Sequence, residues 1–172
     1  RPPQGRVRGV IIIAHGVHQT CGLYGPQYTD LVPVLTTKVN LAVLCLDLRG
    51  FGRSNSSTTS QPWGDDFRTT YVADVAAAVG LSRRLFPHGV PVWLFGHSLG
   101  GLVVSLMASS SPLSSSRFAG ETLPLAPGAI AALRSVKGIL LSAPSLAYKS
   151  PLQELFEGKL VDALGWAFPG AP

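Results

Sequence analysis

One serine of this sequence lies in a pattern that is typical of nucleophilic catalysis. Gly96-His97-Ser98-Leu99-Gly100 has the form G-x-S-x-G, and it joins a segment that predicts a strand over residues 90–95 to one that predicts a helix over residues 99–108. A sharp turn at such a junction strains the serine backbone and lifts its Oγ above the sheet, while the flanking glycines avoid a collision with the neighbouring strand and helix. The free N–H groups at the helix start would face negative charge that develops beside Oγ. We therefore expect Ser98 to be a nucleophile; the alternative is a Gly/Ser turn without reactivity.

A second short motif, His15-Gly16-Val17, follows a β-branched segment that predicts a strand over Val10–Ala14. The tetrahedral oxyanion of an acyl-transfer reaction needs two backbone donors, one from the residue after the nucleophile and one from the loop of a neighbouring strand. We expect these donors to be the N–H groups of Leu99 and Val17. The alternative is that His15-Gly16 only ends the strand.

A third motif, Asp47-Leu48-Arg49-Gly50-Phe51-Gly52-Arg53-Ser54, follows another predicted strand. Its two glycines permit a sharp turn, and Asp47 and Arg49 are placed to pin the loop by hydrogen bonds. We expect this motif to be structural and to take no direct part in catalysis.

The partners that would activate the serine are missing from the sequence. A serine hydroxyl needs a base to take its proton, and the base needs a carboxylate to hold its tautomer. All the histidines precede the serine, and we expect each to be structural or solvated: His15, His18, His88 and His97. Asp162 is the only aspartate after Ser98, but it lies in a segment that does not read as a strand end, so we do not assign it as the acid.

Strands and helices alternate along the chain, which predicts an α/β fold with a parallel sheet covered by helices on both faces. Besides the segments named above, residues 41–46 and 137–141 predict strands, and residues 129–134 a short helix. A helix is expected from Tyr28 to Val39, where Pro33 either starts or bends it, and the clearest helix runs from Phe67, after an Asp65 or Asp66 cap, to Arg84. Residues 109–116 read as a mobile loop, and the apolar residues after Ser145 as a helical excursion.

Composition sets the remaining limits. The 172 residues favour one domain, and 46% apolar against 13% charged residues excludes a disordered chain. The net charge of +5 is scattered, which does not favour a nucleic-acid partner. Residues 85–116 carry no charge, but glycines and a proline interrupt them, so a buried strand, turn and helix explain them better than a membrane span.

Two cysteines, Cys21 and Cys45, are too few for a disulfide framework and lack metal-ligand spacing. We therefore expect a structural or incidental role for both, and no metal site. No targeting signal is visible in the sequence.

Together with Tyr71-Val72-Ala73-Asp74-Val75 and Leu141-Ser142-Ala143-Pro144, these motifs resemble the α/β-hydrolase superfamily, and more narrowly its monoacylglycerol lipase and lysophospholipase branch, which is serine aminopeptidase-like. The resemblance runs from about Val7 to the C-terminus. It implies hydrolysis of a small-molecule lipid ester with a long acyl chain through an acyl-enzyme on Ser98, without cofactor or metal. It also implies that residues 145–172 begin an apolar helical cap over the acyl pocket.

The sequence departs from the branch in two places. Residues 17–21 read Val-His-Gln-Thr-Cys where the family usually has Gly-Glu-His, and residues 109–136 form a longer stretch than usual. These departures leave the head group of the substrate open, and the acyl length is not disclosed either.

The resemblance implies strands before Val7 and after Pro172, the latter carrying the acid and the histidine. We therefore expect the 172 residues to be one incomplete domain, with a core over about 7–144, open sheet edges, poor solubility and little activity alone. The alternatives are a non-catalytic protein that binds a lipid or a partner, and an acyltransferase or thioesterase that uses the same serine. The expected compartment is the cytosol, with peripheral membrane contact through the cap.

Overall fold

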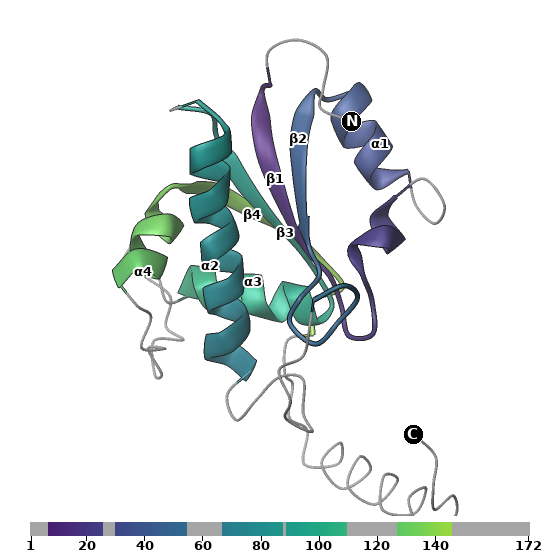
Figure 1. The fold of residues 1–172 in the computed structure, drawn as a ribbon, viewed down its shortest axis with the longest axis vertical. Coiled ribbons are helices and arrows are strands. Elements are labelled where there is room, and N and C mark those ends of the chain that lie inside the picture. The colour runs from purple at the N-terminus through teal and green to yellow at the C-terminus, as the bar shows by residue number, and fades with distance from the viewer. Residues whose placement is uncertain (1–6, 26–29, 55–66, 88, 110–126, 146–172) are drawn as a thin grey trace, which may run out of the picture.

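The computed structural model describes residues 7–25, 30–54, 67–87, 89–109 and 127–145. Its strands are β1 (Gly9–Ala14), β2 (Leu41–Leu46), β3 (Val92–His97) and β4 (Val136–Ser142), and they form one sheet in the order β2-β1-β3-β4 (Figure 1). All three pairings are parallel, with Ile13 of β1 opposite Cys45 of β2 and Phe95 of β3. The predicted parallel α/β architecture is therefore confirmed.

The helices are η1 (Cys21–Tyr24, a 3-10 helix), α1 (Leu31–Thr37), α2 (Phe67–Leu85), α3 (Leu99–Ser109) and α4 (Pro127–Arg134). The four α-helices follow the order that the sequence predicts, although α1 is shorter than expected, whereas η1 was not predicted. Pro33 lies in the first turn of α1, where a backbone N–H has no partner within the helix, so the proline is tolerated there.

The predicted bounds of β3 are wrong by two residues. The prediction started the strand at Val90 and ended it at Phe95, whereas β3 runs from Val92 to His97. Pro91 has no N–H to donate to the sheet, although its carbonyl accepts a hydrogen bond from Val10 N at 2.8 Å. At the other end, pairing with β4 continues through His97, which lies opposite Ser142.

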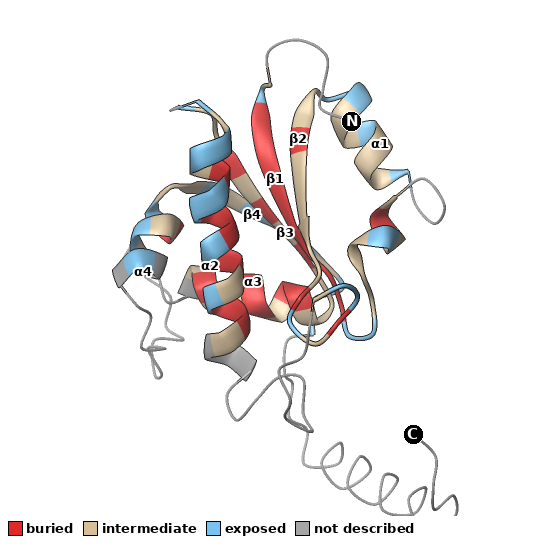
Figure 2. Ribbon diagram, viewed as in Figure 1, coloured by how far each residue is buried: buried red, intermediate tan, exposed pale blue. Residues whose placement is uncertain are grey.

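The main core lies between the sheet and helices α2 and α3, as the buried segments of β1, α2 and α3 show (Figure 2). Because side chains alternate along a strand, the residues next to those of the core point to the other face. There Tyr24 of η1 packs edge-on against Phe95 with the ring centroids 6.2 Å apart, so helical segments lie on both faces of the sheet. The main core comprises Val10, Ile12, Ala14, Tyr71, Val72, Val75, Val79, Val92, Leu94, Val103, Val104 and Met107, with smaller contributions from its margins.

Strands β2 and β4 each pair on one side only within the described residues, as predicted for the two sheet edges. On β4, three consecutive apolar side chains, Ile139, Leu140 and Leu141, are 38–47% exposed. None of the helices in the described ranges is both long and apolar enough to cross a lipid bilayer. The uncharged stretch from residue 85 accordingly contains a strand, a turn and a helix as far as residue 109.

Several sequence predictions lie outside the described residues. They concern the cap over residues 146–172 with Asp162, the tract 110–116, His88, and the expected cap residues Asp65 and Asp66 of α2. The prediction of one incomplete domain also stays a prediction.

Candidate active site

The predicted nucleophile lies in a strained turn between β3 and α3. Ser98 has φ of 51°, in the left-handed region that side chains rarely adopt, and it is half-buried. A Cβ added to Gly96 would lie 2.4 Å from the carbonyl oxygen of Gly100, and one added to Gly100 would lie 2.1 Å from that of Ala14. The glycines on both sides of Ser98 therefore have the steric reason that the sequence predicts.

The segment after β4 holds this turn from the other side. Ser98 N donates to the carbonyl of Ser142 at 3.0 Å, and Ser145 N donates to the carbonyl of Ser98 at 3.0 Å. The hydroxyl of Ser98 lies 3.1 Å from the hydroxyl of Ser145, which is exposed. Ser145, which directly follows the Leu141–Pro144 motif, thus contacts Ser98, and sequence reasoning missed this contact.

The loop after β1 approaches the same serine. A Cβ added to Gly16 would lie 3.0 Å from Cβ of Ser98, and Gly100 N donates to the carbonyl of His15 at 3.0 Å. Within the described residues, neither the backbone N–H of Val17 nor that of Leu99 donates a hydrogen bond. The structure therefore brings the loop of Val17 and the first residue of α3 to one place and leaves both N–H groups for another acceptor.

Gln19 and Tyr24 brace this loop from within. Gln19 Oε1 accepts hydrogen bonds from Gly16 N at 2.9 Å and from the Tyr24 hydroxyl at 3.1 Å, and Gln19 N donates back to the carbonyl of Gly16 at 3.2 Å. Burial raises the pKa of Tyr24 to about 12, so the hydroxyl keeps its proton and remains a donor. The sequence marked Gln19 only as a departure from the family pattern, and its bracing role was missed.

His15 is fully buried and has a structural role, as predicted. Its Nε2 accepts a hydrogen bond from Leu48 N at 2.9 Å, and its Nδ1 donates to the carbonyl of Gly16 at 2.7 Å. Burial lowers the pKa of His15 more than the Gly16 carbonyl and the Asp47 carboxylate raise it. The imidazole is therefore neutral at pH 7, with its proton on Nδ1.

Two other histidines lie near the turn. His97 Nδ1 lies 3.1 Å from the Ser142 hydroxyl, and exposed His18 lies edge-on to Phe51 with centroids 6.1 Å apart. Among the described residues, no histidine makes a hydrogen bond to Ser98 Oγ.

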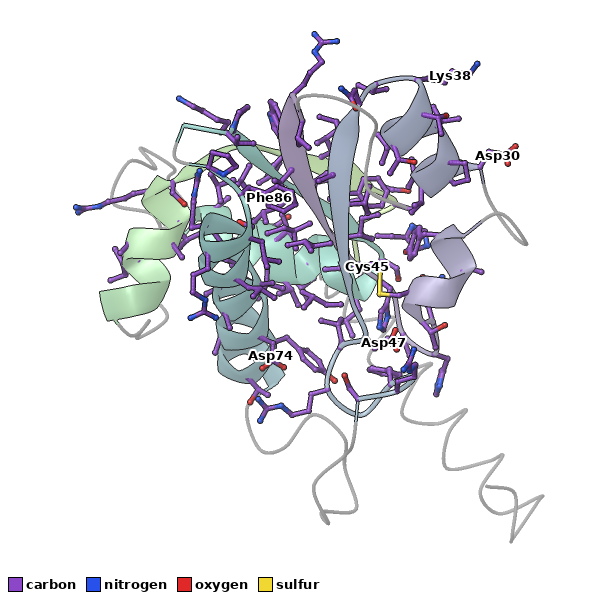
Figure 3. All side chains as sticks on the ribbon, turned by 45° about the horizontal axis from the view of Figure 1, so that its top comes forward. Asp30, Lys38, Cys45, Asp47, Asp74 and Phe86 are labelled. Carbon is purple, nitrogen blue, oxygen red and sulfur yellow. A yellow bond between two sulfur atoms is a disulfide. The ribbon has the colours of Figure 1, made fainter. Side chains whose placement is uncertain are left out.

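The Asp47–Ser54 loop is pinned by its acidic residue. Asp47 Oδ1 accepts a hydrogen bond from Cys21 N at 2.7 Å, and its Oδ2 accepts one from Arg53 N at 2.9 Å (Figure 3). Burial alone would raise the pKa of Asp47, but these two N–H groups help to lower it below its usual value. Asp47 thus joins its own loop to η1, as a structural residue.

Arg49 joins the same loop to α2. It forms an ion pair with Asp74 at 2.8 Å, and its carbonyl accepts a hydrogen bond from the Tyr71 hydroxyl at 3.1 Å. The Tyr71–Val75 motif of α2 and the Asp47–Ser54 motif therefore contact each other directly.

Cys21 and Cys45 form a disulfide with 5.5 Å between their Cα atoms, which is visible as the yellow bond in Figure 3. The sequence predicted a structural or incidental role but no pairing. The bond ties η1 to the end of β2, next to the Asp47 contact with Cys21 N. No pattern in the sequence indicates this pairing, because it depends on the strand order, which brings the loop after β1 to the end of the neighbouring β2.

Comparison with solved structures agrees with this architecture. The structure of MenH from S. aureus is similar, with a TM-score of 0.58 at 18% identity over 94% of this chain and 47% of that chain. At this identity the likeness shows the fold alone. Sheet, helices and the strand-turn-helix serine define an α/β hydrolase fold.

The sequence comparison narrows this class. The family of serine aminopeptidases, S33, matches residues 5–120, and the chain belongs to this family. The resemblance to the serine aminopeptidase-like branch of the α/β hydrolases is therefore confirmed.

The individual relatives share about 30% of the matched residues and are longer than this chain. Monoglyceride lipase of Rattus norvegicus is 30% identical over 110 residues, which are 64% of this chain and 33% of the relative. Protein phosphatase methylesterase 1 of Schizosaccharomyces pombe is 30% identical over 99 residues, which are 58% of this chain and 27% of the relative. The match spans about a third of the length of these curated relatives.

Proposed function

We propose that this chain is the nucleophile-bearing part of a serine hydrolase that cleaves carboxylic esters of lipids. The observation that carries the proposal is the left-handed backbone of Ser98 between β3 and α3, where the loop of Val17 meets the start of α3. A strained serine at this junction is costly to keep for structure alone, since strain of this kind costs about 1–3 kcal/mol and gathers at functional sites.

In this proposal Ser98 Oγ attacks the ester carbonyl carbon and transfers its proton to a histidine that lies outside this sequence. The N–H groups of Val17 and Leu99 donate to the oxyanion of the tetrahedral intermediate. As the intermediate collapses, the bond to the alcohol breaks, the alcohol leaves with the proton, and the acyl group stays on Ser98 until water hydrolyses it. Each oxyanion donor is expected to contribute about 3 kcal/mol to transition-state stabilisation.

The preferred substrate class is a monoacylglycerol or lysophospholipid. It is supported by the resemblance of the motifs to that branch and by relatives named monoglyceride lipase. The acyl chain would be bound by the cap that we expect from residue 145 onward, through which the protein would also contact a membrane surface. The relatives named protein phosphatase methylesterase favour a second candidate, a methyl ester on a protein.

The test uses the natural full-length protein with a fluorophosphonate probe, which reacts only with an activated serine. We expect labelling of Ser98 at a stoichiometry near one, which Ser98→Ala abolishes. Ser105→Ala is the matched control, because it removes one hydroxyl that donates to the carbonyl of Gly101 within α3. A full-length protein that is folded and unlabelled would refute the proposal.

The substrate class is tested separately by measuring hydrolysis of a long-chain monoacylglycerol, a lysophospholipid and a peptide methyl ester. Turnover of either lipid with no cleavage of the methyl ester supports the first candidate, and the reverse result supports the second.

A further inference from the structure

Ser145 makes two hydrogen-bond contacts with the proposed nucleophile. Its backbone N–H donates to the carbonyl of Ser98 at 3.0 Å, and its side-chain hydroxyl lies 3.1 Å from Ser98 Oγ. The backbone contact holds the two residues next to each other, and the hydroxyl contact joins half-buried Ser98 to exposed Ser145.

The chemistry of the two hydroxyls sets the direction of the second bond. In the proposed mechanism, the proton of Ser98 is directed to the histidine base, and the lone pairs of its Oγ remain as acceptors. The Ser145 hydroxyl is then the donor. A hydrogen bond from Ser145 therefore fixes the side-chain orientation of Ser98, so that Oγ is placed for attack on the carbonyl carbon.

The surroundings of Ser145 favour a role at the nucleophile over a role in stability. Its side chain is exposed, and within the described residues its hydroxyl has no hydrogen-bond partner besides Ser98 Oγ. The fold is held at this point by backbone groups and by Pro144, which packs where a Cβ on Gly101 would fall.

We propose that Ser145 is a positioning residue that holds Ser98 Oγ by donating a hydrogen bond to it during acyl transfer. This inference rests on the proposed function of Ser98. It assigns the hydroxyl a contribution to acylation and none to substrate binding, because its contact is with the serine.

The test is the acylation rate of the full-length protein, measured as the burst of p-nitrophenol from a p-nitrophenyl ester of a fatty acid. We expect Ser145→Ala to slow the saturating acylation rate roughly tenfold, which corresponds to about 1.4 kcal/mol, with little change in the concentration for half-saturation. Ser145→Thr keeps a hydroxyl and is expected to restore most of the rate. Ser105→Ala, which removes a hydroxyl within α3 without contact to Ser98, is the control and is expected to react as the wild type does.

Thermal unfolding of each variant separates positioning from folding, and we expect Ser145→Ala to unfold at the wild-type temperature because it keeps the backbone N–H. The inference is overturned if Ser145→Ala acylates at the wild-type rate, if threonine does not restore the rate, or if the loss of rate follows a loss of stability. In each of these cases a fluorophosphonate-labelled wild type leaves the proposed function standing. A wild type without a burst and without labelling overturns both.

Discussion

The packing of Gly100 against the end of β1 can be tested by one substitution, Gly100→Ala. A Cβ on residue 100 would lie 2.1 Å from the carbonyl oxygen of Ala14 and 2.7 Å from that of His15, both of which are backbone atoms. Ordinary contact begins near 3.4 Å, so α3 would have to move away from β1 by about 1.3 Å. That movement would also break the hydrogen bond of 3.0 Å from Gly100 N to the carbonyl of His15.

The free energy of unfolding should therefore fall in Gly100→Ala. Overpacking costs about 1–3 kcal/mol, and a lost buried hydrogen bond costs about 1 kcal/mol or more. Against this stands the higher helix propensity of alanine, about 1 kcal/mol. We expect a net loss of about 2 kcal/mol, together with slower fluorophosphonate labelling of Ser98, because the turn moves away from the loop of Val17.

Gly80→Ala is the matched control. Gly80 is an exposed residue of α2, and an added Cβ would meet no atom within 4 Å. The same substitution should raise the free energy of unfolding there by about 0.5–1 kcal/mol and leave labelling unchanged. Urea unfolding of both variants, followed by circular dichroism, gives the two values. A Gly100→Ala protein that is as stable as Gly80→Ala and labels equally fast would refute the close packing of α3 on β1.

Two further expectations concern the loop after β1. Cys45→Ala should lower the free energy of unfolding by about 3.5 kcal/mol, which is the chain-entropy value for the 24-residue separation of Cys21 and Cys45. Dithiothreitol should lower the melting temperature of the wild type and leave that of the variant unchanged. Equal melting temperatures of the wild type with and without the reductant would count against the disulfide. The lowered pKa of His15 means that the unfolded state binds more protons than the folded state below pH 6.5, so stability should be fully present above that pH and fall as the pH is lowered below it. His15→Gln, whose Oε1 can accept from Leu48 N, should flatten this dependence, and urea midpoints measured across pH 5–8 that fall alike in both proteins would contradict it.

The turn at Ser98 was predictable because most of its requirements are local. A strand, a strained serine and a helix follow one another within a few residues, and Gly96 is needed by the nearby carbonyl of Gly100. Gly100 is the exception, since the carbonyl of Ala14 in β1 requires it, and only the G-x-S-x-G pattern indicated it. The role of Asp47 was predictable for the same reason, since its Oδ2 accepts from Arg53 N six residues later.

The contacts that sequence reasoning missed join segments that are far apart in the chain. Ser145 meets Ser98 across 47 residues, and Cys21 meets Cys45 across 24. Both pairs depend on the strand order β2-β1-β3-β4, which places the ends of neighbouring parallel strands side by side. The alternation of strands and helices predicts a parallel sheet but leaves its order open. These contacts follow only when the order is known.

The order also explains why the loop of Val17 is fixed before any substrate arrives. β1 lies between β2 and β3, so the chain that leaves β1 is held from both sides. On the β2 side, the disulfide and Nε2 of His15 hold it; on the β3 side, Gly100 N holds the carbonyl of His15. Within the loop, Gln19 Oε1 accepts a hydrogen bond from Gly16 N, the residue before Val17. For the two oxyanion donors that we propose, a loop held in this way means that little reorganisation is needed when charge develops.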